Sequence, residues 1–300
     1  MEFLEILKVI LLGIVEGITE WLPVSSTGHM LLVDQLFTLN ASDEFKDMFF
    51  VVIQLGAILA VVVMFWKKLF PWRLQKTTQP TGEKTSNGMD VLVTKNQVVS
   101  DKGIFKLWLK VIVACVPAAV IGLALEVTDL EKYLETPLII ALALILYGVA
   151  FIVVERFNKN RELPIKTTDD ISYKKALIIG AFQVLSLIPG TSRSGATIIG
   201  ALLIGVDRPA GSEFTFFLAI PVMAGASALK ILMFILDGSR LAGGEIGYLL
   251  IGMLVAFAVS LFAIKFLMNF VKRHSFTSFG WYRIVLGAII IGALVIPTFF

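Results

Sequence analysis

Charged side chains are scarce in this sequence, and that scarcity excludes most classes of protein. Asp, Glu, Lys and Arg make up 16% of the 300 residues, whereas hydrophobic residues make up 57%. A typical soluble chain carries about 25% charged residues, so too few polar side chains remain here to cover a water-facing surface. The same deficit excludes an intrinsically disordered chain. The sequence therefore predicts a protein embedded in lipid.

Cysteine and histidine are rare as well, with one and two copies. The single Cys115 cannot form an internal disulfide and lies in an apolar run, so we expect a packed residue without a redox function. The net charge is only +3, and we expect no nucleic-acid partner. The first residues, MEFLEILKV, are acidic where a secretory signal is basic, so we expect the N-terminus to be retained.

Six apolar stretches are long enough to cross a bilayer, which needs about 20 residues per helix. They lie at roughly 49–66, 109–126, 137–154, 214–236, 247–267 and 281–298. Two further apolar regions, 3–37 and 173–205, are each interrupted in the middle by Pro, Gly and Ser. Each side of such a break is too short to span the membrane, which predicts two re-entrant helix-turn-helix hairpins. Non-helical backbone at that depth is tolerated only where it is buried or lines a wet cavity, so the breaks predict a functional site.

The Lys and Arg residues give the orientation of these spans. Segment 67–110 holds nine of them, 155–175 holds six, and 265–283 holds Lys265, Lys272, Arg273 and Arg283. The alternate loops 38–48, 127–136 and 237–246 hold three basic residues against eight acids. The positive-inside rule then places the basic segments in the cytoplasm, including a polar insertion at 72–106 that we expect to be a solvated loop. Trp21 and Trp281 fit the pattern of membrane-interface anchors.

The chain also contains a weak internal repeat. Gly13, Glu16, Phe49 and Phe50 recur 167 positions later as Gly180, Gln183, Phe216 and Phe217, and PVSS (23–26) matches PGTS (189–192) at a spacing of 166. Each half reads as a broken hairpin followed by three spans, so the second copy enters from the opposite face. We therefore predict one all-α integral membrane domain, 1–300, with an inverted-topology repeat: 1–157 forms the first half and 173–300 the second.

The two breaks carry residues suited to binding an anion. Ser25 and Ser26 precede one predicted helix, and Thr191 and Ser192 precede the other, which are positions that favour N-caps. Simple capping explains any one such pair, but Arg193 in the second break is costly at membrane depth unless it has an anionic partner. Two opposed helix N-termini with an Arg fork would suit phosphate oxygens.

Glu16 and Glu20 project from one face of a half-helix, four residues apart. Two carboxylates so placed share a proton, hold a divalent cation such as Mg²⁺ or Ca²⁺, or stay neutral through hydrogen bonds. His29 lies three residues beyond Ser26, where it is either structural or a base or nucleophile for the same cavity.

The motifs EGITEWLPVSSTGH (16–29) and PGTSRSGAT (189–197) resemble the two signature motifs of the undecaprenyl-diphosphate phosphatase family, also known as the bacitracin-resistance proteins. The resemblance covers essentially the whole chain. It implies an enzyme of the bacterial plasma membrane that removes the terminal phosphate of undecaprenyl diphosphate and so recycles a carrier lipid for the cell wall. By this resemblance Glu16 and Glu20 form the acidic motif, Ser26 and His29 occupy nucleophile or base positions, and Arg193 is the phosphate clamp.

Several points follow from this resemblance as expectations. Substrate contacts should come from the two helix starts: Ser25, Thr27, Gly28, Gly190, Thr191, Ser192, Ser194 and Thr197. We favour Ser26 over His29 as nucleophile because a helix N-terminus suits the phosphorus position. A divalent cation at Glu16 and Glu20, a site open to the outer side and a homodimer are further expectations. The alternative function is a polyprenyl-phosphate flippase, because inverted repeats are typical of transporters.

Overall fold

The computed structural model describes residues 2–84, 87, 90–126 and 134–299, and the described chain is mainly helical. Within these residues six helical segments are long and apolar enough to cross a membrane. They are Asp43–Met64, Lys102–Leu125, Pro137–Asn158, Arg208–Leu236, Glu245–Phe270 and Thr277–Val295. Each overlaps one of the six spans predicted from the sequence, so the chain is a multi-pass membrane protein. Most of the predicted outer loop 127–136 lies outside the described residues.

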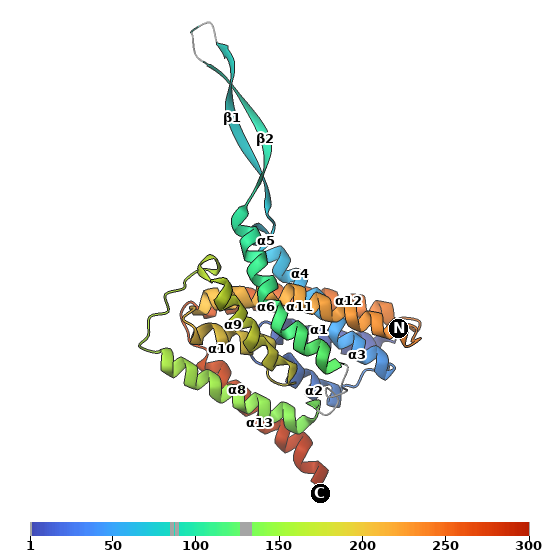
Figure 1. Cartoon of the computed structure of the whole chain (residues 1–300). Helices are drawn as coiled ribbons and strands as arrows, with labels where there is room; N and C mark the ends of the chain where they lie inside the picture. Colours follow the sequence, from blue (N-terminus) through green and yellow to red (C-terminus); the bar gives the residue numbers. More distant parts are fainter. Residues whose placement is uncertain (1, 85–86, 88–89, 127–133, 300) are drawn as a thin grey trace.

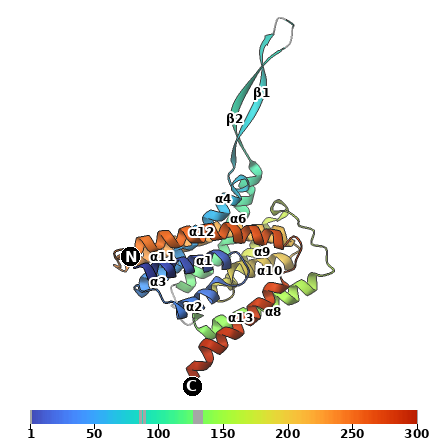
Figure 2. The same cartoon turned by 180° about the vertical axis from the view of Figure 1, so that it is seen from behind.

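The helices of the two halves form one bundle (Figures 1 and 2). The first half contains α1 (Phe3–Thr19), α2 (Ser26–Leu36), α3 (Asp43–Val52), α4 (Gln54–Met64), α5 (Trp66–Leu69), α6 (Lys102–Glu126) and α8 (Pro137–Asn158). The second half contains α9 (Tyr173–Val184), α10 (Arg193–Leu203), α11 (Arg208–Leu236), α12 (Glu245–Phe270) and α13 (Thr277–Ile290). Short 3-10 turns lie at Thr168–Asp170 and Leu185–Leu187, and the chain ends in a π turn at Ile291–Val295 followed by a 3-10 turn at Ile296–Phe299.

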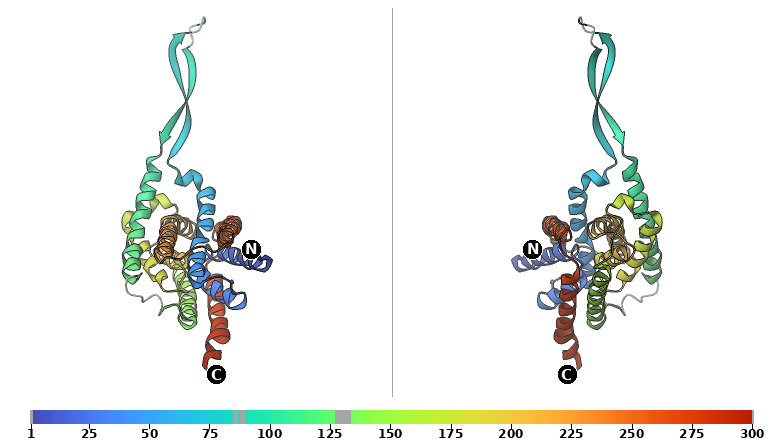
Figure 3. Two further views of the ribbon diagram at one scale, coloured as in Figure 1. Left: turned by 90° about the vertical axis from the view of Figure 1, so that its right-hand side faces the viewer. Right: turned by 90° about the vertical axis from the view of Figure 1, so that its left-hand side faces the viewer.

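The insertion between α5 and α6 is a long hairpin and not the loop that we predicted. Strands β1 (Trp72–Lys84) and β2 (Asp90–Ser100) pair in antiparallel fashion, with Trp72 opposite Ser100. The prediction was wrong because DVLVTKNQVVS (90–100) is rich in Val, which favours strands. Residues 102–106 form the start of α6. The hairpin projects away from the bundle in every view (Figures 1 and 3).

Both interrupted regions fold as helix-turn-helix hairpins whose two ends are tied together. In the first, Lys8 Nζ donates to the carbonyl oxygen of Thr38 at 2.8 Å, which joins the start of α1 to the end of α2. In the second, Lys175 Nζ donates to the carbonyl oxygen of Ile204 at 3.0 Å, which joins the start of α9 to the end of α10. Each hairpin therefore returns to the end of the bundle from which it started.

The two hairpins open at opposite ends of the bundle. The open end of the first packs with Phe234, near the end of α11, and Tyr248, near the start of α12. At the open end of the second, Asn158 Nδ2 donates to the carbonyl oxygen of Leu202, and Val206 leads directly into α11. Because α11 runs the length of the bundle, the hairpins point toward each other and their turns meet inside.

Close helix packing fixes the first helix of each hairpin. A Cβ added to Gly13 would lie 2.9 Å from the carbonyl oxygen of Gly252 in α12, and one added to Gly180 would lie 2.1 Å from that of Ala114 in α6. Small residues allow such approach between membrane helices. The first helix of each half thus packs against the second long apolar helix of the other half, and this reciprocal pairing is what an inverted repeat predicts.

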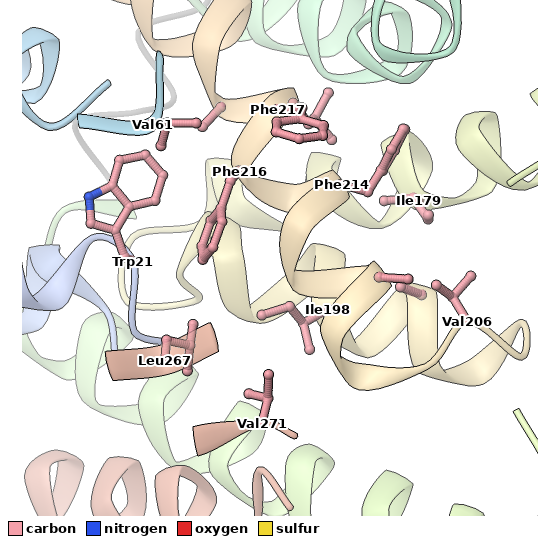
Figure 4. Packing of buried hydrophobic residues seen from close by; sticks show 14 of the residues in the cluster. Trp21, Val61, Ile179, Ile198, Val206, Phe214, Phe216, Phe217, Leu267 and Val271 are labelled. Carbon is pink, nitrogen blue, oxygen red and sulfur yellow. The ribbon is translucent and has the colours of Figure 1, made fainter. Parts of the chain in front are cut away.

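Aromatic and aliphatic side chains fill the space around the two turns. Trp21 is fully buried and meets Phe216 of α11 edge-on, with ring centroids 5.3 Å apart (Figure 4). Val61, Ile198 and Phe217 belong to the same core (Figure 4). The prediction that Trp21 anchors the chain at the membrane interface is wrong, because Trp21 lies at the tip of the first hairpin and packs inside the bundle.

Candidate active site

The two hairpin tips contain the same local motif. Ser25 caps α2 with φ 74°, and its Oγ accepts from the N–H of Gly28 at 3.3 Å. Ser192 caps α10 with φ 71°, and its Oγ accepts from the N–H of Gly195 at 3.2 Å. Left-handed backbone is rare for residues other than glycine, so its occurrence at two positions 167 residues apart marks equivalent turns.

This equivalence corrects the pairing made from the sequence. The spacing of 166 matches Ser26 to Ser192. In the structure the two caps, Ser25 and Ser192, correspond to each other. Ser26 then corresponds to Arg193, because these are the first residues of α2 and α10. Since Ser25 supplies the cap, the Ser26 hydroxyl is left for another partner.

Glu20 is that partner, and it joins the two tips. Ser26 Oγ donates to Glu20 Oε2 at 2.9 Å, and Arg193 Nη2 donates to Glu20 Oε1 at 3.0 Å. The side chains of Glu20 and Arg193 are each only 9% exposed. The sequence predicted all three residues for the site, and the fold brings them together around one carboxylate.

Arg193 is oriented by groups other than Glu20. Its Nη1 donates to the carbonyl oxygen of Thr215 in α11 at 3.0 Å, and its Cζ lies 5.9 Å from the centre of the Trp21 ring. Its buried Nε has no hydrogen-bond partner among the described residues. The guanidinium therefore keeps an unused donor beside the carboxylate, as a group that binds an external anion would.

Glu16 lies one helical turn before Glu20 and is buried, with 1% of its surface exposed. It is close enough to Glu20 and Arg193 for electrostatic interaction, yet its Oε1 has no partner within the described chain. In that part of the chain no three His, Cys, Asp or Glu side chains form a cluster that could hold a metal ion. Two carboxylates with one unused oxygen do fit Mg²⁺, which is commonly bound by one or two carboxylates together with substrate phosphates and water.

His29 is held by its own set of contacts. Its Nδ1 lies 2.7 Å from the carbonyl oxygen of Ser25, and its Nε2 lies 2.6 Å from the hydroxyl of Tyr282 in α13. A carbonyl oxygen can only accept, so Nδ1 carries the proton, and in the neutral ring Nε2 accepts from Tyr282. Within the described residues His29 has no hydrogen bond to Glu20, Ser26 or Arg193. The structure thus places it beside the site on a separate network.

The remaining predicted substrate-binding residues mostly stabilise the turns. Ser194 Oγ lies within reach of the carbonyl oxygens of Glu20 and Leu22, at 3.2 and 3.4 Å, and 3.1 Å from Ser192 Oγ. Thr197 Oγ1 donates to the carbonyl oxygen of Arg193 and accepts from Thr215. Gly28, Gly190 and Thr191 take part in the turns through their backbones: the Gly28 N–H donates to Ser25 Oγ, and the other two carbonyl oxygens accept from Arg283. Thr27 is exposed.

Arg283 lies at the hairpin tips and not where the sequence predicts it. We counted it among the cytoplasmic cations, but it is fully buried in α13 and donates to the carbonyl oxygens of Pro23, Gly190 and Thr191. The available signal was its position inside the apolar stretch 281–298, because an Arg at membrane depth needs partners. Tyr282, which contacts His29, was missed because nothing local marks it.

Comparison with known proteins now identifies the family. A family model described as bacitracin resistance protein BacA matches residues 9–289. The chain belongs to this family. Curated proteins named undecaprenyl-diphosphatase are similar over nearly their full length. One from Enterococcus faecalis is 60% identical over 291 residues, covering 97% of this chain and 98% of the relative. One from Acetivibrio thermocellus is 50% identical over 288 residues, with 96% and 97% covered.

The family match, residues 9–289, contains both hairpin tips and, within the described residues, those that contact Glu20. The site combines a hydroxyl, a carboxylate and a guanidinium at two opposed helix N-termini. Helix N-termini and guanidinium groups attract phosphate, and a carboxylate can accept a proton from the hydroxyl. These are the groups that phosphoryl transfer to a serine or to water requires.

Proposed function

We propose that this chain is an undecaprenyl-diphosphatase, which hydrolyses undecaprenyl diphosphate to undecaprenyl phosphate and inorganic phosphate and so recycles the carrier lipid for cell-wall synthesis. The observation that carries this proposal is the convergence of Ser26 and Arg193, from two opposed helices, on Glu20. The family assignment and the identity of 60% to an undecaprenyl-diphosphatase support it.

In the mechanism that we propose, the diphosphate lies between the N-termini of α2 and α10. Arg193 and the backbone N–H groups of the two first turns bind the terminal phosphate and stabilise the charge that develops in the transition state. Ser26 Oγ attacks the terminal phosphorus while Glu20 accepts the Ser26 proton. The bond between phosphorus and the bridging oxygen breaks, Glu20 gives its proton to that leaving oxygen, and undecaprenyl phosphate leaves. Glu20, again a carboxylate, then takes a proton from water, whose oxygen attacks the phosphorus of the phosphoserine. The bond between phosphorus and Ser26 Oγ breaks, Glu20 returns the proton to Oγ, and inorganic phosphate is released.

A divalent cation fits this scheme at Glu16 and Glu20. These two carboxylates would hold it together with phosphate oxygens of the substrate, and it would neutralise the charge of the leaving phosphate. His29 is the rival nucleophile in our proposal. Its contact with Tyr282 supports a role at the edge of the site, since the Nε2 lone pair is already occupied.

Location and assembly belong to the same proposal. The basic segments that join the spans support a bacterial plasma membrane orientation with the insertion in the cytoplasm. Under that orientation the first hairpin is re-entrant from the outer leaflet and the second from the inner leaflet, and we propose a site that opens to the outer side. The homodimer stays a prediction.

Phosphate release by the purified protein in detergent, with undecaprenyl diphosphate as substrate, tests the function. Ser26→Ala and Arg193→Ala should abolish release, whereas Ser100→Ala on the hairpin and Arg161→Ala, both on exposed residues, should retain it. A flippase would release no phosphate even as the unaltered protein. Absence of release from the unaltered chain, with and without added Mg²⁺ or Ca²⁺, would overturn the proposal.

A further inference from the structure

Arg283 connects the two hairpin tips through their backbones. Its Nη1 donates to the carbonyl oxygen of Pro23 in the first turn, at 3.2 Å. Its Nη2 donates to the carbonyl oxygens of Gly190 and Thr191 in the second turn, at 2.9 and 2.7 Å. No backbone hydrogen bond joins the two turns within the described residues. Apart from the contacts of Arg193 and Ser194 to the first turn, this guanidinium is therefore what fastens one tip to the other.

The surroundings of Arg283 fit this role, and only its buried Nε has no hydrogen-bond partner among the described residues. The side chain is fully buried, and no carboxylate lies within 4.0 Å of it in the described part of the chain. Three carbonyl dipoles and the Tyr147 ring, whose centre is 5.7 Å from Cζ, surround the charge instead. A buried guanidinium whose only hydrogen bonds go to turn carbonyls is held in place to fix those turns.

The helix that carries Arg283 is itself firmly placed. A Cβ added to Gly280 in α13 would lie 2.7 Å from the carbonyl oxygen of Gly148 in α8, and one added to Gly148 would lie 2.6 Å from that of Gly280. Figures 1 and 2 show α8 and α13 side by side along their length. A Cβ on Gly195 in α10 would lie 3.1 Å from Arg283 Nη1, so the absence of a side chain there gives the guanidinium its space.

We propose that Arg283 is a positioning residue for the reaction: it holds the two hairpin tips in register, so that Arg193 from one and Ser26 from the other stay aligned on the same phosphate. This inference rests on the proposed phosphatase function. Arg283 itself touches none of the reacting groups, but a displacement of about 1 Å between catalytic groups is enough to cost about 10²-fold in rate.

The expected signature is a loss in kcat with little change in KM. Arg283→Met removes the three hydrogen bonds and retains bulk, and we expect kcat to fall about 10²-fold while KM changes less than about threefold. Arg283→Lys keeps the charge and some donors, so it should recover about tenfold of that loss. Arg208→Met is the control, because Arg208 is half-buried and paired with Glu155 but contacts neither tip. It should lower thermal stability without changing kcat per folded molecule.

Coupling to Arg193 separates positioning from a general loss of structure. In an Arg193→Lys background, Arg283→Lys should lower kcat by less than half the factor that it does alone, since both changes disturb the same alignment. Any of three results would overturn the inference. The first is that the two changes have additive effects, and the second is that kcat for Arg283→Met stays within threefold of the unaltered protein. The third is that Arg208→Met loses as much kcat as Arg283→Lys. Failure of the unaltered protein to release phosphate would instead refute the phosphatase function, so the two failures are distinguishable.

Discussion

Replacement of Glu20 by Gln tests the centre of the site, because the two oxygens of this carboxylate have different partners. Oε1 accepts from Arg193 and Oε2 accepts from Ser26. In Glu20→Gln one oxygen becomes an NH₂ group, which cannot face the guanidinium because both would be donors. The amide oxygen must therefore face Arg193, and the NH₂ group must face Ser26 Oγ.

This arrangement reverses the hydrogen bond to Ser26. The Ser26 hydroxyl would then accept from the amide, and its proton would have no base to receive it. General-base catalysis contributes about 10²–10⁴-fold, or about 3–5 kcal/mol of barrier, so kcat for Glu20→Gln should fall by that factor. Stability should fall less, because the contact with Arg193 remains as a hydrogen bond to a neutral oxygen. Breaking such a buried pair outright would cost about 3–5 kcal/mol, and that figure is an upper bound here.

The assay is phosphate release from undecaprenyl diphosphate, measured beside thermal unfolding in the same detergent. Glu213→Gln is the matched control, because Glu213 is as buried as Glu20, at 8% exposed, and also accepts from a cation, Lys68. It contacts neither tip and should retain kcat. If Glu20→Gln keeps more than about a tenth of the normal kcat while folded, Glu20 does not accept the Ser26 proton.

Three further outcomes follow from the structure. Chelation of divalent cations should abolish activity, and Glu16→Gln should raise the Mg²⁺ concentration needed for half-maximal rate at least tenfold; full activity in chelator would remove the cation from the scheme. A phosphoenzyme trapped by rapid acid quench should carry phosphoserine at Ser26, and recovery of phosphohistidine would assign the nucleophile to His29. Replacing residues 75–97 by a short Gly-Ser turn should leave kcat within about twofold, because the two strands of the hairpin pack mainly against each other in the described part of the chain; a large loss would show that the hairpin acts on the bundle.

The spans and both interruptions could be predicted because each depends on local composition. Length and hydropathy define a membrane helix, and Pro, Gly and Ser interrupt one wherever they cluster. Glu16 and Glu20 could be placed on one face from helical spacing alone. The hairpin at 72–100 was missed because polar turn residues near its tip dominated the interpretation, whereas the flanking Val and Thr residues carried the strand signal.

The contacts that complete the site depend on tertiary structure, and the sequence does not display them. Whether Ser25 or Ser26 caps α2 is decided by a left-handed backbone angle at Ser25, which no local pattern requires. Arg283 lies 90 residues from the second tip and 257 from Ser26, so only the packing of α13 against α8 brings it to both turns. A lone basic residue at a span boundary usually lies at the lipid interface, so the sequence pattern predicts that position for Arg283.

The chemistry of the site follows from equivalent backbones that carry different side chains. At the spacing of 167 set by the two caps, Ser26 corresponds to Arg193, Glu20 to Leu187 and Glu16 to Gln183. If both tips carried the carboxylates, four acids would meet in a buried space. If both tips carried the Arg, two guanidinium groups would compete for one anion. Each arrangement places like charges together without water and is therefore costly. Division of the groups gives one tip the hydroxyl and the acids and the other tip the cation. The two halves are then complementary in charge, and in the proposed function their meeting point is where the diphosphate binds and is cleaved.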